Sequence, residues 1–192
     1  RIDADLIVLS VGVRPDTGPF EAAGIACEPG AIVVDEHGRT SAPRVWAVGD
    51  ATAAVDAVTG VRRPIALAGP ANRAGRLIAD DILRPGSARA VPSSVGTAIV
   101  RVGSLTVALT GANRAALDAA GTRYRTLHLH PNQHAGYFPG AVQLHLIVHF
   151  REDDGRLLGA QAVGEDGVDK RIDVLATAIR SSLAVDDLMD LD

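Results

Sequence analysis

A glycine and an aspartate at the end of an apolar strand are the residues best placed to bind a ligand. Residues 45–48 are typical of a short strand, which runs directly into Gly49 and Asp50. In open α/β sheets, ligands bind at the carboxyl edge of the strands. Gly49 would let a ligand approach the backbone closely, and the Asp50 carboxylate offers two acceptor oxygens to a ligand hydroxyl. The pattern also fits a simpler role in which Asp50 caps the next turn, and the residues alone leave both interpretations open.

Three histidines lie close together in the second half of the chain. His128 and His130 occupy alternate positions of a predicted strand and so share one face, and His134 follows shortly after. Three imidazoles could bind zinc, or they could simply line a polar face. No acidic or thiol ligand stands at a tight spacing from them, so we predict no metal site.

Cys27 is the single cysteine of the chain. A reactive thiol needs a nearby cation or a helix N-terminus to lower its pKa. Glu28 beside it would have the opposite effect, and no recognisable motif surrounds it. We therefore predict that Cys27 is neither a catalytic nucleophile nor part of an internal disulfide.

The first half of the chain reads as short strands followed by a helix. Continuous apolar runs predict strands over residues 5–12, 31–35 and 45–48. Apolar residues at helical spacing predict a helix over 71–83. Residues 84–94 are rich in Pro, Gly and Ser and have no periodicity, which indicates a linker and a domain boundary.

The second half of the chain reads as a sheet with two helices. Strands are predicted over 97–109 (a two-stranded meander), 124–129, 142–150 and 156–163, with helices over 114–120, capped by Asn113, and 168–183. One long helix cannot cover both faces of a sheet of about five strands. The remaining apolar face predicts a homodimer through residues from about 95 onward, because a second copy supplies the matching surface.

Composition excludes several classes of protein. Hydrophobic residues make up 47% of the 192 residues and charged residues 22%, as in ordinary globular proteins. The net charge of −4 and an aromatic content of 3% argue against a nucleic-acid groove. No run approaches 18 apolar residues, which argues against a membrane span. The first residues lack the layout of a signal peptide, so we predict a cytoplasmic location.

Three stretches in chain order resemble the pyridine nucleotide-disulfide oxidoreductase family, namely residues 5–15, 40–50 and 67–76. The second stretch is similar to the family's second flavin-binding motif, which implies that Asp50, with Gly49 beside it, binds a ribityl hydroxyl of FAD. The third resembles the helix start that points at the flavin pyrimidine and implies that Leu67 and Ala68 contact the cofactor. A helix N-terminus stabilises negative charge, here on the N1–C2=O side of a reduced flavin.

Residues 130–141 and 164–173 resemble the coenzyme A-disulfide reductase branch of that family. The resemblance implies that Tyr137 bonds to a substrate or to a sulfur intermediate. Tyr137 could instead be an interface aromatic with a solvated hydroxyl. Phe138 stands where the branch carries a second tyrosine. The family's redox cysteine, first Gly-x-Gly-x-x-Gly motif and nicotinamide-binding glycines have no counterpart in these residues.

The resemblance implies a partial FAD/NAD(P)-binding, Rossmann-like α/β segment followed by an α+β dimerisation domain. Residues 1–35 would end a nucleotide-binding domain, 36–88 would be the C-terminal segment of an FAD-binding domain, and 94–192 would be the dimerisation domain. The implied function is that of the C-terminal portion of an FAD- and NAD(P)H-dependent reductase of coenzyme A disulfide or another small disulfide. The alternatives are an NADH oxidase or peroxidase of the same family, or a module that only dimerises.

Two expectations concern the chain in isolation. It should be inactive and bind no FAD, because it lacks the Gly-rich turn that holds the pyrophosphate. Residues 1 to about 85 should be less ordered than the rest, because their strands have exposed edges.

Overall fold

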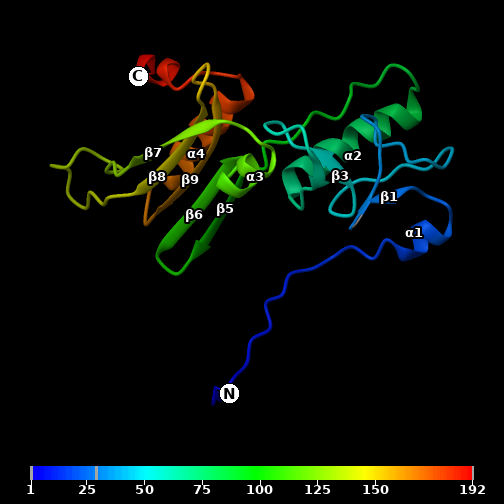
Figure 1. Ribbon diagram of the computed structural model, residues 1–192, viewed down its shortest axis with the longest axis horizontal. Helices are drawn as coiled ribbons and strands as arrows, with labels where there is room; N and C mark the ends of the chain where they lie inside the picture. Colours follow the sequence, from blue (N-terminus) through cyan, green and yellow to red (C-terminus); the bar gives the residue numbers. More distant parts are fainter. Residues whose placement is uncertain (1, 29, 192) are drawn as a thin grey trace.

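The computed structural model of the protein describes residues 2–28 and 30–191 and begins with an extended tail (Figure 1). Residues 2–14 belong to no helix or strand, and the large apolar side chains of this tail are exposed. The prediction of a strand over residues 5–12 is therefore wrong. A β-strand forms only where a neighbour pairs with its N–H and C=O groups, and no described strand pairs with this segment.

Short antiparallel strand pairs and one long helix make up the N-terminal part. Its elements are α1 (Gly18–Ala22), β1 (Cys27–Glu28), β2 (Ala31–Ile32), β3 (Ala53–Val55), β4 (Arg62–Pro64) and α2 (Ala68–Leu83). β1 pairs with β2 and β3 with β4, and a parallel bridge from Ile32 to Thr52 links the two pairs. The predicted helix is confirmed as α2. The strand predicted over 45–48 is reduced to one bridge between Trp46 and Arg39.

The turn between β3 and β4 is organised by Asp56, whose carboxylate is buried. One carboxylate oxygen accepts the N–H groups of Val58 and Thr59, each at 3.0 Å. The other accepts Nε and Nη2 of Arg63 at 3.1 and 2.8 Å. Burial alone would raise the pKa of Asp56, but the bonds from Thr59, Arg63 and Val58 together hold it below its ordinary value.

A five-stranded antiparallel sheet forms the C-terminal part (Figure 1). Its strand order is β5-β6-β9-β8-β7, from β5 (Ala98–Val102), β6 (Leu105–Gly111), β7 (Tyr124–Leu129), β8 (His145–Arg151) and β9 (Leu157–Gly164). The helical elements are α3 (Arg114–Ala119), α4 (Val168–Arg180) and the 3₁₀ turn Asp186–Asp190. The predicted cap is confirmed, because Asn113 Oδ1 accepts the Ala116 N–H at 3.0 Å. The order of strands, sheet and helices matches the predicted α+β class.

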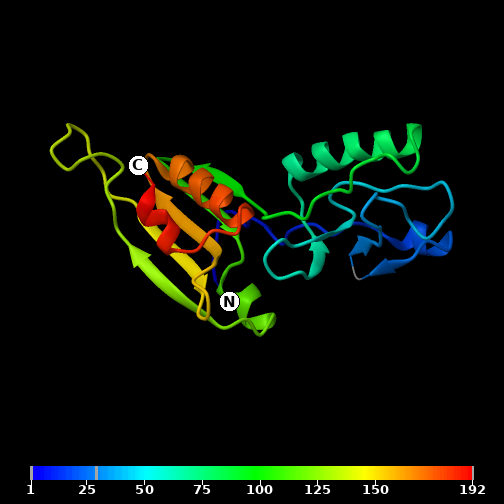
Figure 2. The same cartoon turned by 90° about the horizontal axis from the view of Figure 1, so that it is seen from above.

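α4 packs against one face of this sheet and encloses the main core (Figure 2). The buried side chains there are apolar, among them Ala108, Leu146, Val148, Ala160, Ala162, Ile172 and Leu175. The alternate positions of β5 and β6 carry large apolar side chains that stay exposed, namely Val100, Val102, Leu105, Val107 and Leu109. The register pairs Val100 with Val107 and Val102 with Leu105, so these side chains share the face opposite α4.

The two parts of the chain meet where the β3–β4 turn reaches the second sheet. Val58, two residues after Asp56, packs against the cores around both α4 and α3. The Ala57 N–H donates to the Ser94 carbonyl at 2.8 Å, and the Ser94 N–H donates to the Val55 carbonyl at 2.9 Å. Arg180 of α4 donates to the Ser93 carbonyl at 2.9 Å. The Asp56 turn is therefore the contact that joins the two parts.

Replacing Asp56 should destabilise this junction. Asp56→Asn removes the charge that bonds Arg63, and we expect the free energy of unfolding at neutral pH to fall by about 2 kcal/mol. Because the folded pKa is depressed, the contribution is present above the unfolded carboxyl pKa and is lost as the pH falls through the folded value. The free energies of unfolding of the wild type and the variant, measured by denaturant titration, should converge as the pH falls below about 4.

Asp153→Asn is the matched control. Asp153 also pairs with an arginine, Arg123 at 2.9 Å, but both side chains are largely exposed. Its removal should change stability by no more than about 0.5 kcal/mol. Equal losses for the two variants would show that the Asp56 turn does not join the two parts.

Candidate functional site

Gly49 and Asp50 follow the Trp46 bridge in a tight turn. Gly49 has a positive φ of 93°, and its carbonyl accepts the Thr52 hydroxyl at 2.8 Å and the Thr52 N–H at 3.0 Å. A Cβ built on Gly49 would meet no atom within 4 Å, so the space beside it is open. Asp50 is exposed, and its carboxylate has no hydrogen-bond partner among the described residues. The side chain that caps this turn is therefore Thr52, whose hydroxyl donates to the Gly49 carbonyl. Both carboxylate oxygens of Asp50 remain available to accept hydrogen bonds from a ligand.

The start of α2 presents free backbone donors. Leu67 precedes the helix in an extended conformation (φ −134°, ψ 133°), and no side chain caps the helix. The first N–H groups, of Ala68 and Gly69, have no partner within the helix. Pro70 has no N–H, so these two groups are the donors of the first turn. They favour an anionic or electron-rich group at this end of α2.

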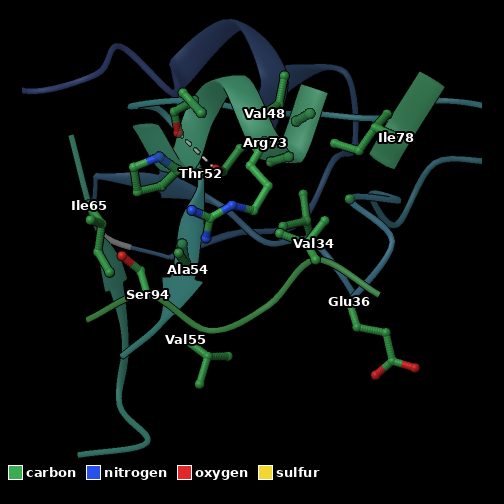
Figure 3. A pocket seen from close by; sticks show the side chains of 18 of the residues that line it. Val34, Glu36, Val48, Thr52, Ala54, Val55, Ile65, Arg73, Ile78 and Ser94 are labelled. Carbon is green, nitrogen blue, oxygen red and sulfur yellow. Dashed lines mark hydrogen bonds between the residues drawn. The ribbon is translucent and has the colours of Figure 1, made fainter. Parts of the chain in front are cut away.

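A pocket of about 310 Å³ lies between α2 and the segments around Val34, Val48 and Ala54 (Figure 3). Gly49 lines it, whereas Asp50, Leu67 and Ala68 lie outside its lining. Apolar side chains dominate the lining, including Val34, Val48, Val55, Ile65 and Ile78. The structure thus places Gly49 and the first turns of α2 around one pocket.

Arg73 is a pocket residue that the sequence reasoning did not single out. Figure 3 shows its guanidinium extending from α2 toward Thr52 and Ala54. Among the described residues it has no ion-pair or hydrogen-bond partner. Its position follows from helical spacing, because Arg73 stands three residues after Pro70, which lines the same pocket. The pocket therefore combines apolar walls with the cationic side chain of Arg73.

A buried carboxylate fixes α2 against the segment that leads to Gly49. Asp81 is 1% exposed and accepts Arg39 Nε at 2.8 Å, Arg39 Nη2 at 2.6 Å and the Trp46 indole N–H at 3.0 Å. His37 Nδ1 lies 4.0 Å from the same carboxylate. The hydrogen bonds from Arg39 and Trp46 hold the pKa of Asp81 below its ordinary value. Asp81 thereby sets the position of the Gly49 turn relative to α2.

Tyr137 lies outside this pocket, and the loop that carries it projects at the opposite end of the molecule from α2 and β3 (Figure 1). It belongs to the loop between β7 and β8, and it is 91% exposed. Phe138 beside it is also exposed and packs against His134 with a ring-centroid distance of 4.9 Å. Within one copy of the chain, the structure does not bring Tyr137 together with Gly49 and Asp50.

Of the three histidines singled out in the sequence, His130 pairs with His145 rather than with His128 or His134. His130 Nδ1 lies 2.7 Å from His145 Nδ1 across the β7–β8 hairpin. His149 is buried, and its ring bonds the Thr126 hydroxyl at 2.9 Å and Gln161 Oε1 at 3.2 Å. Burial is the main cause that lowers the pKa of His149. Within residues 2–28 and 30–191, no three His, Cys, Asp or Glu residues are arranged to hold a metal ion.

Cys27 is half-buried in β1 and has no disulfide partner. Burial raises the pKa of its thiol, and the charge of Glu21 raises it further. The acidic neighbour that acts on the thiol is Glu21, where the sequence had suggested Glu28. Nothing at this position favours the thiolate.

Two family models match the chain. The model described as pyridine nucleotide-disulphide oxidoreductase matches residues 1–75, and the model of that family's dimerisation domain matches residues 97–191. Models of one family therefore match both parts of the chain. The chain belongs to the pyridine nucleotide-disulphide oxidoreductase family.

Relatives by sequence agree with this assignment. The chain is 32% identical to the coenzyme A disulfide reductase of Staphylococcus haemolyticus over 192 residues, covering 99% of this chain and 43% of that protein. It is also 32% identical to the coenzyme A disulfide reductase of Staphylococcus epidermidis, covering 98% and 42%. The chain therefore spans less than half the length of these curated relatives.

Solved structures show the same fold. The reduced Bacillus anthracis CoADR-RHD has a TM-score of 0.91 at 42% identity, covering 100% of this chain and 34% of that one. A NAD-dependent persulfide reductase from A. fulgidus has a TM-score of 0.91 at 36% identity, covering 98% and 35%. The resemblance predicted from the motifs is confirmed. No helix among the described residues is long and apolar enough to cross a membrane.

Trp46, the single tryptophan, should report on the Asp81 cluster. Because the folded pKa of Asp81 is depressed, its stabilisation is present above the unfolded carboxyl pKa and is lost as the pH falls through the folded value. We expect Trp46 emission to change only below about pH 4. Asp81→Asn should lower the stability at neutral pH and abolish this acid titration.

Asp80→Asn is the control, because Asp80 is the neighbouring residue but pairs at the surface with Arg84. It should leave the emission titration of Trp46 unchanged. An unaltered titration in Asp81→Asn would rule out Asp81 as the group that Trp46 senses.

Proposed function

We propose that these 192 residues are the flavin-contacting and dimerising C-terminal portion of an FAD- and NAD(P)H-dependent reductase of coenzyme A disulfide or another small disulfide. The observation that carries the proposal is the free Asp50 carboxylate at the Gly49 turn, next to the helix whose start is uncapped. Relatives named coenzyme A disulfide reductase align along nearly the whole chain, which supports the substrate class.

The residues present fit a flavin. Open space beside Gly49 admits a ligand, and the unpartnered Asp50 carboxylate can accept a ribityl hydroxyl. The free N–H groups of Ala68 and Gly69, which follow Leu67, would face the N1–C2=O side of the ring system and stabilise negative charge there. When bound, FAD would supply the transfer of electrons from NAD(P)H toward the disulfide.

The division of labour along the chain is part of this proposal. Residues 1–35 would complete a nucleotide-binding domain, residues 36–88 the FAD-binding domain, and residues 94–192 would form the dimer. The dimerisation model over residues 97–191 and the exposed apolar face of β5 and β6 support a homodimer. In the dimer, Tyr137 would reach the partner copy and bond the disulfide substrate or a sulfur intermediate.

Removing the Asp50 carboxylate tests the flavin contact. In the complete FAD-dependent protein that the proposal requires, Asp50→Ala should weaken FAD binding by about tenfold to a hundredfold, because a hydrogen bond to a charged group contributes about 1.5–3 kcal/mol. The measurement is retention of flavin absorbance on dilution and gel filtration. Asp190→Ala, at an exposed site near the other end of the chain, should retain flavin like the wild type. Full retention in Asp50→Ala would refute the assigned contact.

The nature of the electron acceptor separates this proposal from a related oxidase. Coenzyme A disulfide should accelerate NAD(P)H consumption in the complete protein under anaerobic conditions. Consumption that depends on oxygen or peroxide and ignores the disulfide would assign the chain to an oxidase or peroxidase instead.

A charge on the exposed sheet face should prevent dimer formation. Val107→Arg places a guanidinium in the centre of the apolar face of β5 and β6, where burial without a partner is costly. Sedimentation of the 192-residue chain at micromolar concentration should show a dimer for the wild type and a monomer for this variant. Val174→Arg makes the same change at a residue of similar exposure (49% against 41%) on α4 and should remain dimeric. A monomeric wild type would contradict the proposed interface.

A further inference from the structure

The loop of residues 134–141 projects beyond the end of the five-stranded sheet (Figures 1 and 2). It connects β7 to β8 and carries Tyr137 and Phe138 at exposed positions. Its interior has few contacts of its own, with backbone bonds from the Phe138 N–H to the Ala135 carbonyl at 2.8 Å and from the Ala141 N–H to the Phe138 carbonyl at 3.0 Å. A loop this sparsely bonded needs an external anchor if it is to hold one conformation.

Gln133 supplies one anchor at the neck of the loop, where residues 131–133 pair with residues 142–144. Its side chain is 8% exposed on a loop that is otherwise largely solvent-accessible. Its Oε1 accepts the Val142 N–H at 2.6 Å, and its Nε2 donates to the Gly140 carbonyl at 3.1 Å. The backbone N–H of Gln133 also donates to the Val142 carbonyl at 3.1 Å. One amide thus ties both strands of the neck, and an apolar side chain there would leave two backbone groups unpaired.

Arg171 supplies the second anchor, from α4. Its Nη2 donates to the carbonyl of Gln133 at 3.0 Å and to that of Asn132 at 3.4 Å. It forms no ion pair with a described carboxylate. The Arg171 guanidinium therefore donates to backbone carbonyls at the neck. Hydrogen bonds from a charged donor are stronger than hydrogen bonds between neutral groups.

The start of α4 lies directly against the neck. Gly167 precedes the helix with φ 74°, and a Cβ built on it would come within 2.8 Å of the Gln133 Cβ. Two residues of α4 close by, Val168 and Ile172, are fully buried in the core. A continuous packed path therefore runs from the core through α4 to the neck of the Tyr137 loop.

We propose that Gln133 and Arg171 are positioning residues that fix the 134–141 loop and so present Tyr137 to a second copy of the chain. This inference rests on the proposed function, in which Tyr137 contacts the disulfide at the partner's site. Neither residue needs to touch the substrate. Each acts through the loop, by limiting the conformations that Tyr137 can adopt before the substrate binds.

The first test measures the loop itself in the 192-residue chain. Arg171→Met and Gln133→Leu should accelerate hydrogen exchange of the Phe138 and Ala141 amides by about tenfold or more, since both amides are bonded only within the loop. Chymotryptic cleavage after Tyr137 or Phe138 should accelerate in parallel. Amides of the β8–β9 ladder should keep their wild-type rates, which shows that the sheet remains folded.

A matched control and a rescue accompany these variants. Lys170→Met alters the exposed neighbour of Arg171. It should exchange like the wild type at Phe138 and Ala141. Arg171→Lys retains a cation that can donate to a carbonyl and should lie between the wild type and Arg171→Met. Unchanged loop exchange in Arg171→Met and Gln133→Leu overturns the inference.

The second test measures how the loop affects turnover of coenzyme A disulfide in the complete FAD-loaded enzyme. Arg171→Met should lower kcat/KM for coenzyme A disulfide by about tenfold to a hundredfold, with partial recovery in Arg171→Lys. NAD(P)H oxidation by ferricyanide, which takes electrons from the flavin, should be unchanged. Adding Arg171→Met to Tyr137→Phe should cause no further loss, because the two changes remove the same contribution.

The outcomes of the second test separate the two proposals. A Tyr137→Phe enzyme with full disulfide activity overturns the role of Tyr137 in the proposed function, whatever the loop does. A defective Tyr137→Phe enzyme together with a fully active Arg171→Met enzyme overturns the positioning role alone.

Discussion

The buried Asp81 carboxylate is the interaction on which the N-terminal part depends. A charge that is 1% exposed is tolerable only when it is paired and hydrogen-bonded, and Arg39 and Trp46 meet that requirement. Both partners belong to the stretch that leads to Gly49, whereas Asp81 belongs to α2. The two components of the candidate flavin site, the Gly49 turn and the start of α2, are therefore held in register by an ion pair outside the site itself. The short strands contribute little to holding these components together, since β1 to β4 each span only two or three residues.

Much of the C-terminal part could be predicted from the sequence, because its elements are local and regular. Alternating strands, the Asn113 cap and the apolar stripe of α4 each leave a pattern within about a dozen residues. Reliance on local patterns also explains why the strand over residues 5–12 was predicted wrongly. Its apolar run is typical of a buried strand, but a strand depends on a neighbour, which the run itself cannot reveal. Gly49 and Asp50 were identifiable from the apolar stretch that precedes them, although only one bridge forms there. The separation of Tyr137 from them could not be predicted, because it depends on tertiary structure.

Long-range polar contacts were the part that sequence patterns could not supply. Asp81 stands on the apolar face of α2, four residues after Leu77, and an acidic residue at such a position signals a buried ion pair. Its partner could not be named, because Arg39 is 42 residues away. Gln133 and Arg171 are separated by 38 residues, and neither breaks a local pattern. Contacts of this kind decide how rigidly functional side chains are held, while periodicity decides only which element carries them.

The Asp56 turn has a consequence for how such proteins can be recombined. The chain crosses from one part to the other near residues 84–94, which would be the natural point for exchanging C-terminal modules among relatives. Val58, however, reaches across that point and packs against both cores of the second sheet. A chimera joined in the linker would combine a foreign sheet with a turn shaped for another surface. The unit that must be exchanged as a whole is therefore the C-terminal sheet together with the β3–β4 turn, although the turn precedes the linker in the chain.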